Sequence, residues 1–322
     1  MPLNYANTRS LNTTCMDVSN IFCRVFLAIL MFVYTTAVTA ANPYDFPPMA
    51  DIHLHYNWSQ EEVTSPEEAV RQLKKHNVTL AVVSSRPSAN ALKLQQAGGD
   101  WIIPIYSPYF KPGIKETWFI FPEVLVHTRK ALASGKFKGI GEMHLVPGMG
   151  PRRDNKVVQG LFKLAAEFNV PVLIHTDTSK YEYLLPICKQ HKKVRFLWAH
   201  AGGILLPADI DPLMAACPNV SVELSARDPL HYGYFVDPGE KLSSEWRNLF
   251  MKYPLRFMTG TDPVLNAHQT YRWHEPDEGW SHYGKLNIFH RNWMRQLPAN
   301  VEKNIRLLNA QRFFGVKGLD QQ

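Results

Sequence analysis

Short apolar runs alternate with amphipathic segments eight times along the chain, and this alternation constrains the fold more than any other feature. The runs are rich in Val, Ile and Phe and cover residues 49–53, 79–84, 101–106, 139–143, 171–175, 195–200, 220–224 and 256–259. Segments with helical spacing lie between them, for example residues 66–76, 123–134, 156–168 and 181–191. Strands that alternate with helices predict a parallel sheet covered by helices.

Eight strand–helix units in roughly 270 residues fit a closed (β/α)₈ TIM barrel. An open doubly wound sheet is the alternative, and the positions of the polar residues at the strand ends favour the barrel. No linker-like stretch follows residue 45, so residues 41–322 are predicted to form one domain. Residues 228–248 and 266–287 are longer than ordinary connections, and we expect them to pass over the barrel mouth. Ser65 followed by Pro66 and two acids predicts a helix start.

The N-terminus has the pattern of a secretory signal peptide. An apolar run over residues 25–40 follows Arg24 and ends in Val38-Thr39-Ala40, small residues that signal peptidase accepts. Its strongly apolar centre is short for a membrane span, although an uncleaved anchor is the alternative. We predict that residues 1–40 are a signal peptide, that cleavage follows Ala40, and that the protein is exported to the periplasm or secreted.

Charge and cysteines add little that is specific. Loss of residues 1–40 lowers the formal net charge from +7 to +6, and the Lys and Arg residues are scattered rather than clustered. We therefore expect no nucleic-acid partner; oligomeric state stays open. Cys188 and Cys217 remain after cleavage. An exported protein could pair them, and two free thiols are the equal alternative.

Histidines and acidic residues stand where the predicted strands end. The first strand ends Asp51-Ile52-His53-Leu54-His55, and because side chains alternate along a strand, His53 and His55 project to the same side. Later strand ends supply Glu142, His144, His175, His200 and Asp262. Active sites of barrels form at the carboxyl ends of the strands, so these side chains are expected to converge.

Each of these residues also has an ordinary structural explanation. A lone histidine is often a hydrogen-bonded core residue, and Asp262 after Gly260-Thr261 would suit a helix N-cap. Five strands that each supply a ligand-type group at the same depth favour a metal site instead. Imidazole together with carboxylate suits zinc, iron or manganese rather than calcium.

These residues resemble the amidohydrolase superfamily. The likeness spans nearly the whole mature chain, from the Asp51–His55 segment to residues 308–315, which resemble the closing Asn-Ala-x-x-x-Phe of that superfamily. The His200-Ala201-Gly202-Gly203 segment is most similar to the amidohydrolase-related branch, also called amidohydrolase 2. That branch includes lactone and amide hydrolases, hydratases and non-oxidative decarboxylases.

The resemblance implies that His53, His55, His175 and Asp262 ligate a divalent metal, with zinc expected as one or two ions. It implies that His200 is a second ligand or a catalytic base. Many two-metal members carry a carboxylated lysine at the end of the fourth strand. This chain has Glu142 at that position, which is more like the deoxyribonuclease-like and some phosphotriesterase-like branches. Glu142 would bridge two metals or orient substrate, and the number of ions stays open.

The predicted activity is cleavage of a C–O or C–N bond in a small lactone, ester or amide. Zinc lowers the pKa of its bound water from 15.7 to about 7, and Asp262 is expected to take the proton of this water and pass it to the leaving group. Arg86, His144 and Arg227 are candidates for binding a substrate carboxylate. Tyr106, Tyr109, Trp58 and Tyr232 are candidates for the pocket wall, although rim aromatics often have no such role.

Three other functions stay open at this stage. The same metal set would serve non-oxidative decarboxylation of a small acid, which release of carbon dioxide would reveal. Glu142 and the basic charge also fit phosphodiester hydrolysis, but the scattered charge disfavours a nucleic-acid track. A secreted binding protein on a relict barrel is the alternative outside enzymes, and the intact ligand set disfavours it.

Overall fold

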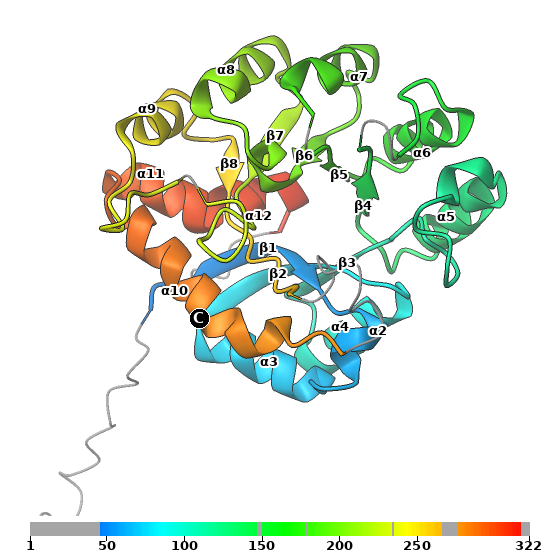
Figure 1. Ribbon diagram of the computed structural model, residues 1–322. Helices are drawn as coiled ribbons and strands as arrows, with labels where there is room; N and C mark the ends of the chain where they lie inside the picture. Colours follow the sequence, from blue (N-terminus) through cyan, green and yellow to red (C-terminus); the bar gives the residue numbers. More distant parts are fainter. Residues whose placement is uncertain (1–45, 147–149, 178, 234, 266–275, 317–322) are drawn as a thin grey trace, which may run out of the picture. The chain divides into compact units, whose positions relative to one another are not determined.

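A ring of parallel strands surrounded by helices makes up the described part of the chain. The computed structural model describes residues 46–146, 150–177, 179–233, 235–265 and 276–316 (Figure 1). Its strands are β1 (Met49–His55), β2 (Val78–Ser84), β3 (Ile102–Ile105), β4 (Ile140–His144), β5 (Val172–His175), β6 (Phe196–Trp198), β7 (Val220–Glu223) and β8 (Phe257–Met258). Each lies within one residue of a predicted apolar run or extends it, except β6, which ends two residues before the end of its predicted run.

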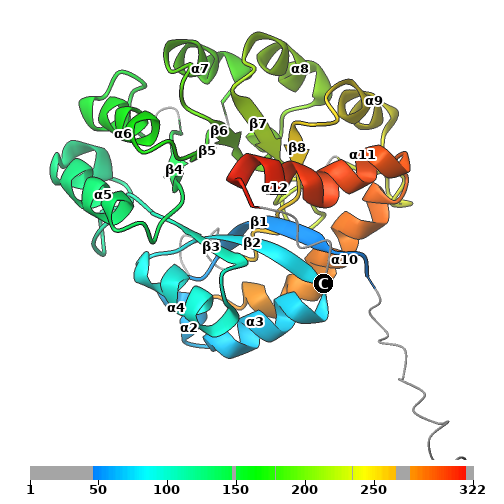
Figure 2. The same ribbon diagram turned by 180° about the vertical axis from the view of Figure 1, so that it is seen from behind.

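The helices surround the ring of strands in both views, except the last helix, which lies across one end of the barrel (Figures 1 and 2). They are α2 (Trp58–Glu61), α3 (Pro66–Lys75), α4 (Ala89–Gly98), α5 (Glu123–Ala133), α6 (Lys156–Glu167), α7 (Leu185–Gln190), α8 (Pro207–Ala216), α9 (Ser244–Lys252), α10 (Tyr283–Met294), α11 (Ala299–Lys303) and α12 (Asn309–Phe314). The predicted start of α3 is confirmed, since the Glu68 amide donates to Ser65 Oγ at 3.2 Å and Pro66 opens the helix.

Backbone hydrogen bonds close the ring. Parallel pairing runs in the order β1-β2-β3 and β4-β5-β6-β7-β8. A parallel bridge between Tyr106 and Ile140 joins β3 to β4. The Ile52 amide donates to the Thr259 carbonyl at 3.0 Å, which joins β1 to the segment that follows β8. The sheet is therefore a closed barrel, and the open doubly wound alternative is excluded.

The interior of the barrel is apolar where the strands begin. Ala50, Leu80, Ile103, Leu173 and Met258 are buried together there with further strand residues. Leu307 and Ala310 of the C-terminal helical segment join this cluster, and Figure 2 shows α12 lying across that end of the barrel. This packing leaves the opposite end, where the strands finish, free for polar side chains.

The closing Asn-Ala segment has a structural role. The Asn309 side-chain amide donates to the carbonyls of Pro254 and Phe257, at 3.0 and 2.7 Å, and so ties α12 to the start of β8. This contact explains why an asparagine stands at the end of the barrel farthest from the predicted site.

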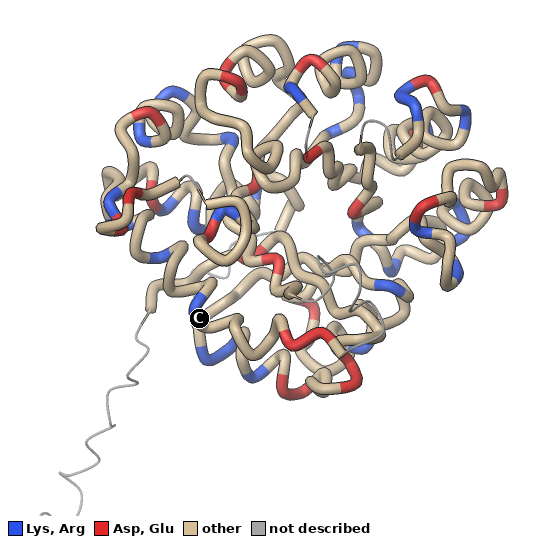
Figure 3. The backbone as a smooth tube through the Cα atoms, in the orientation of Figure 1, with Lys and Arg blue, Asp and Glu red and all other residues tan. Residues whose placement is uncertain are grey.

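A disulfide joins Cys188 in α7 to Cys217 at the end of α8, which decides between the two alternatives left open for these cysteines. In the part of the chain that the structure describes, no helix combines the length and apolar character needed to cross a membrane. The predicted signal peptide, residues 1–40, lies outside the described residues. Lys and Arg residues are spread over many helices and loops in Figure 3, as the sequence predicts.

The two long connections differ in how far they can be described. Residues 228–233 and 235–243 form an irregular segment before α9, and Tyr232 from this segment lines the cavity at the barrel mouth. The other connection, predicted over residues 266–287, lies partly outside the described residues, because the description resumes at residue 276.

Candidate metal centre

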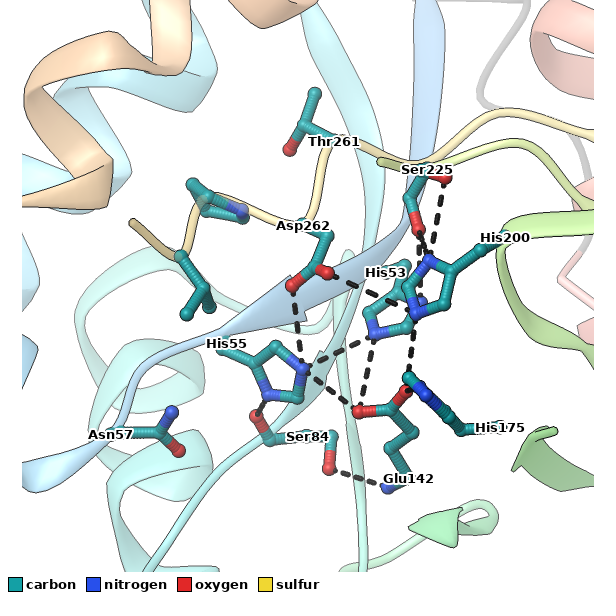
Figure 4. A network of polar contacts seen from close by, with 12 residues as sticks. His53, His55, Asn57, Ser84, Glu142, His175, His200, Ser225, Thr261 and Asp262 are labelled. Carbon is teal, nitrogen blue, oxygen red and sulfur yellow. Dashed lines mark hydrogen bonds and ion pairs between the residues drawn. The ribbon is translucent and has the colours of Figure 1, made fainter. Parts of the chain in front are cut away.

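The end of β1 directs two imidazoles to one point. The His55 Nδ1–H donates to the Ser84 carbonyl at 2.9 Å, and the His53 Nδ1–H donates to Glu223 Oε1 at 2.8 Å. The two Nε2 atoms lie 3.2 Å apart (Figure 4). Because each Nδ1 proton has an oxygen acceptor, both Nε2 lone pairs face the same space, which is the arrangement in which histidines ligate metals.

Glu142, in the middle of β4, lies between two pairs of histidines. Its Oε2 is 3.3 Å from His55 Nε2 and 3.8 Å from His53 Nε2. Its Oε1 is 2.7 Å from His175 Nδ1 and 3.3 Å from His200 Nε2. A carboxylate in this position can contact a cation on either side, as predicted for a bridging ligand.

Ser84, at the end of β2, fixes part of this geometry, and the sequence analysis did not identify it. Its hydroxyl accepts the Glu142 backbone amide at 2.8 Å and donates to the Gly141 carbonyl at 2.6 Å. Its own carbonyl accepts the His55 ring proton. One serine therefore orients ligand candidates from two different strands.

His200 and Asp262 complete the cluster from the segments that follow β6 and β8. Both have left-handed backbones, with φ of 55° and 47°. The His200 Nδ1 lies 2.9 Å from Ser225 Oγ, and its Nε2 lies 4.0 Å from Asp262 Oδ2. The other oxygen of Asp262 is 3.5 Å from His55 Nε2, and the Asp262 amide donates to the His53 carbonyl at 2.8 Å. Closure of the barrel thus places Asp262 beside the β1 histidines.

The electrostatics of the cluster favour a bound cation. Burial opposes a charge on His53, yet Glu223, Asp262 and Glu142 raise its pKa well above the ordinary value. Burial alone would raise the pKa of Asp262, but His53, His55 and His200 lower it to about 2. The carboxylates therefore hold positive charge in a buried site, and a metal would take the place of the imidazole protons.

The donor set fits a divalent metal. Ligand atoms of His53, His55 and Asp262 lie within 4.8 Å of one another, as do those of His53, Glu142 and His200. The Asp262 Oδ1 is buried and has no hydrogen-bond partner, so it retains a free lone pair in the cluster. A second group, Glu142, His144 and His175, meets the same distance limit, which leaves room for one ion or two.

Glu223 supports the cluster from β7 and was missed by the sequence analysis. Besides the His53 ring, it accepts the His200 amide at 2.7 Å, the Ser225 amide at 2.8 Å and the Ser225 hydroxyl at 3.0 Å. It is completely buried. A carboxylate that holds the outer nitrogen of a metal-ligating histidine fixes its tautomer and orientation. The available signal was its position, because it ends a strand as the predicted ligands do.

The prediction that Arg227 binds substrate does not fit its position. Arg227 is completely buried and does not line the cavity. Its guanidinium donates to the carbonyls of His200, Ala201 and Leu205 at 2.8, 2.9 and 2.6 Å, and it packs over the Trp246 ring. Arg227 therefore holds the backbone turn that carries His200, rather than a ligand.

The other two predicted substrate residues, Arg86 and His144, do line the cavity. Burial, together with the charges of His175, Lys115 and Arg86, lowers the pKa of His144 well below its ordinary value, against an opposing effect of Glu142. The ring is therefore neutral, and its Nδ1 accepts the Tyr109 hydroxyl proton at 2.7 Å.

The predicted aromatic wall is half present. Tyr109 and Tyr232 line the cavity, whereas Trp58 and Tyr106 do not. Trp58 is 45% exposed, and Tyr106 packs edge-on against Phe137 with ring centroids 5.3 Å apart. The cavity has a volume of about 220 Å³, below the range of pockets for drug-sized ligands, so it suits only a compact small molecule.

Two further lining residues, Ser107 and Lys115, were not identified from the sequence. Both come from the segment after β3, whose predicted strand end carries no ligand-type residue. Lys115 in particular stands ten residues beyond the last residue of β3, so strand-end position gives no signal for it.

Comparison with known proteins assigns the family. A family model described as Amidohydrolase matches residues 117–316, which is more than half of the chain. The chain belongs to the amidohydrolase family. The match is to the amidohydrolase 2 branch that the His-Ala-Gly-Gly segment resembles, and members of this family are metal-dependent enzymes. No curated protein matches this amidohydrolase in sequence.

Solved structures share the fold of this amidohydrolase at low sequence identity. A Burkholderia multivorans amidohydrolase with bound zinc has a TM-score of 0.55 and 13% identity, covering 84% of this chain and 100% of that one. An uncharacterised TIM-barrel protein from Bordetella bronchiseptica has a TM-score of 0.57 and 12% identity, covering 84% and 99%. The 5-carboxyvanillate decarboxylase of Novosphingobium aromaticivorans, complexed with manganese, has a TM-score of 0.50 and 12% identity, covering 86% and 97%.

Proposed function

We propose that this amidohydrolase cleaves a C–O or C–N bond in a small lactone, ester or amide by adding water. The observation that carries the proposal is the position of Asp262. One of its oxygens is buried without a hydrogen-bond partner and the other faces His200 at 4.0 Å, in a cavity whose volume suits a small molecule. A carboxylate in this position can take a proton from water and return it to a leaving group.

His53, His55, His175 and Asp262 would hold the metal, with Glu142 and His200 as the remaining candidate ligands. When bound, the metal supplies an acidified water and polarises the scissile carbonyl; zinc is the expected ion. Asp262 is ionised at neutral pH, because the neighbouring histidines lower the pKa of its carboxyl to about 2 against the opposing effect of burial.

His200 would stabilise negative charge on the reacting carbonyl oxygen. Burial opposes its charge, but Asp177, Glu142 and Glu223 raise its pKa to about 9. Its Nδ1 is held at Ser225 Oγ, which leaves Nε2 directed toward Glu142 and Asp262. The fixed ring would therefore need no reorientation during the reaction, which is the condition for electrostatic stabilisation of a transition state.

The experiment is Asp262→Asn on metal-loaded protein. The variant keeps the shape and one oxygen of the side chain but cannot accept a proton, so turnover of a hydrolysed lactone, ester or amide should fall by roughly 10²–10⁴. Metal content, measured by elemental analysis, should be largely retained. Asp228→Asn is the matched control, because Asp228 is also buried but pairs with His231. Near-normal turnover of Asp262→Asn at equal metal loading would remove Asp262 from the mechanism.

Non-oxidative decarboxylation is the second candidate, supported by the fold shared with the 5-carboxyvanillate decarboxylase. The two reactions are distinguished by their products. Hydrolysis adds the elements of water to the substrate, whereas decarboxylation releases carbon dioxide and leaves a product that lacks one carboxyl group. Mass spectrometry of the products from a panel of lactones, esters, amides and aromatic acids would separate them.

We also propose that the protein is exported and cleaved after Ala40. The Cys188–Cys217 disulfide supports this proposal, because disulfides persist in oxidising compartments. N-terminal sequencing of protein recovered from the secretory route should begin near Ala41. Recovery of uncleaved protein from the cytoplasm alone would refute it.

A further inference from the structure

One side of the cavity carries hydrogen-bond donors without acidic partners. Arg86 lies just after β2, and Ser107 and Lys115 lie in the segment after β3; all three line the cavity. Among the described residues, neither Arg86 nor Lys115 has an Asp or Glu oxygen within 4.0 Å. The Ser107 hydroxyl is buried and has no hydrogen-bond partner.

This arrangement is costly without a ligand. Lys115 is largely removed from water, and both this burial and the nearby charge of Arg86 lower its pKa, against the opposing charges of Glu142, Glu116 and Asp262. The positive charges of Lys115 and Arg86 are thus held near one another in a partly buried cavity. The buried Ser107 hydroxyl in the same cavity lining has no hydrogen-bond partner. Buried charges in proteins are normally paired, and an unpaired group loses its hydration without compensation. An anionic group placed here would offset all three costs.

The metal cluster forms another part of the same cavity lining, through His55, Glu142, His175, His200 and Asp262. A small molecule in a cavity of about 220 Å³ can therefore contact the donors and the cluster together. The molecule would present an anionic end to Arg86 and Lys115 and its reacting bond to Asp262 and His200.

We propose that the substrate of this amidohydrolase is a small carboxylic acid whose carboxylate binds Arg86, Lys115 and the Ser107 hydroxyl. The inference rests on the proposed function for the orientation of the scissile bond. A carboxylate matches the planar donor fork of arginine through two parallel hydrogen bonds. The remaining lone pairs of the carboxylate oxygens can accept hydrogen bonds from Lys115 and Ser107.

The test compares two unreactive ring compounds that differ only in charge, tetrahydrofuran-2-carboxylate and tetrahydrofuran-2-carboxamide. Both are titrated calorimetrically into zinc-loaded protein. The carboxylate should bind more tightly, and Arg86→Gln and Lys115→Gln should each weaken it by about 10- to 100-fold, the range for a hydrogen bond to a charged group. Carboxamide binding should stay unchanged in both variants, which also shows that the cavity is intact.

Lys111→Gln is the matched control, because Lys111 is an exposed lysine of the same segment and does not line the cavity. It should leave carboxylate binding unchanged. Equal carboxylate affinity in the wild type, Arg86→Gln and Lys115→Gln would overturn the proposal, since the probe would then bind through the metal alone. Inorganic phosphate that binds more tightly than the carboxylate, and that is lost in the same variants, would overturn the choice of a carboxylic acid.

The hydrolysis of γ-butyrolactone and of its γ-carboxylate separates this inference from the proposed function. Faster cleavage of the carboxylate, lost in Arg86→Gln, supports both. Failure to cleave any lactone, ester or amide, with carboxylate binding that still depends on Arg86 and Lys115, would refute the hydrolase proposal and leave the substrate class standing. Cleavage of neutral lactones with no dependence on either residue would do the reverse.

Discussion

Replacement of Glu223 by glutamine tests whether the metal centre depends on a residue that does not itself reach the metal. Glu223 Oε1 accepts the His53 ring, the His200 amide and the Ser225 hydroxyl, and Oε2 accepts the Ser225 amide. A glutamine can keep its carbonyl oxygen at the Oε1 position and so preserve three of these four contacts. Its NH₂ group then faces the Ser225 amide, donor against donor.

Two effects of different size follow from this geometry. The unpaired Ser225 amide should lower the free energy of unfolding of the metal-free protein by about 1–3 kcal/mol, the cost of a buried unsatisfied donor. Loss of the negative charge behind His53 lowers the basicity of this ligand, and we expect metal affinity to fall by about 10- to 100-fold. That range corresponds to about 1.4–2.7 kcal/mol of binding free energy.

The assay is competition for zinc between the protein and a chelator of known affinity, with chemical denaturation of the metal-free protein in parallel. Glu167→Gln is the control, because Glu167 is an exposed glutamate that pairs with Arg129 at the surface, and such pairs contribute about 0–1 kcal/mol. Zinc affinity of Glu223→Gln within twofold of the wild type would show that His53 is oriented without Glu223 and would refute the reasoning.

Two further changes probe backbone positions near the cluster. Gly260→Ala would place a Cβ 2.7 Å from His53 Cβ and 2.9 Å from Glu223 Oε2. Metal content, measured by elemental analysis, should therefore fall sharply. The control Gly239→Ala, at a surface turn, should keep its metal. Arg227→Lys keeps the charge but loses the three-carbonyl fork under His200, whose turn has positive φ at His200, Ala201, Gly202 and Gly203. We expect kcat to fall about tenfold or more with KM nearly unchanged, since correct positioning of a catalytic group is worth at least this much. An unchanged kcat would show that Arg227 contributes to stability alone.

Most of the fold follows from local patterns that the sequence displays. The eight apolar runs, the Ser65 cap and the helical segments between the runs predict the elements to within a few residues, because each is decided by neighbours in the chain. The end of β6 is different. The run 195–200 looks like one strand, but the strand ends at Trp198 because His200 takes a left-handed backbone that only the barrel contacts around Arg227 and Glu223 make tolerable.

The ligand candidates were predictable for a related reason. In a barrel all strands finish at the same end, so the positions of His53, His55, Glu142, His175 and Asp262 relative to the apolar runs imply that they converge. Sequence alone did not separate the roles of residues after the strands. Arg86 and Arg227 both follow a strand end, yet one lines the cavity and the other lies beneath the His200 turn.

The sequence by itself therefore determined the barrel and the set of ligand candidates, since both depend on apolar periodicity and on the residue at each strand end. The tertiary structure alone decided the supporting contacts, which are Glu223 behind His53 and Ser84 behind His55 and Glu142, and it brought Lys115 into the same cavity lining as Arg86. These contacts join residues 29 to 170 positions apart along the chain. They depend on barrel closure and on the path of the loops, and no local pattern encodes either one.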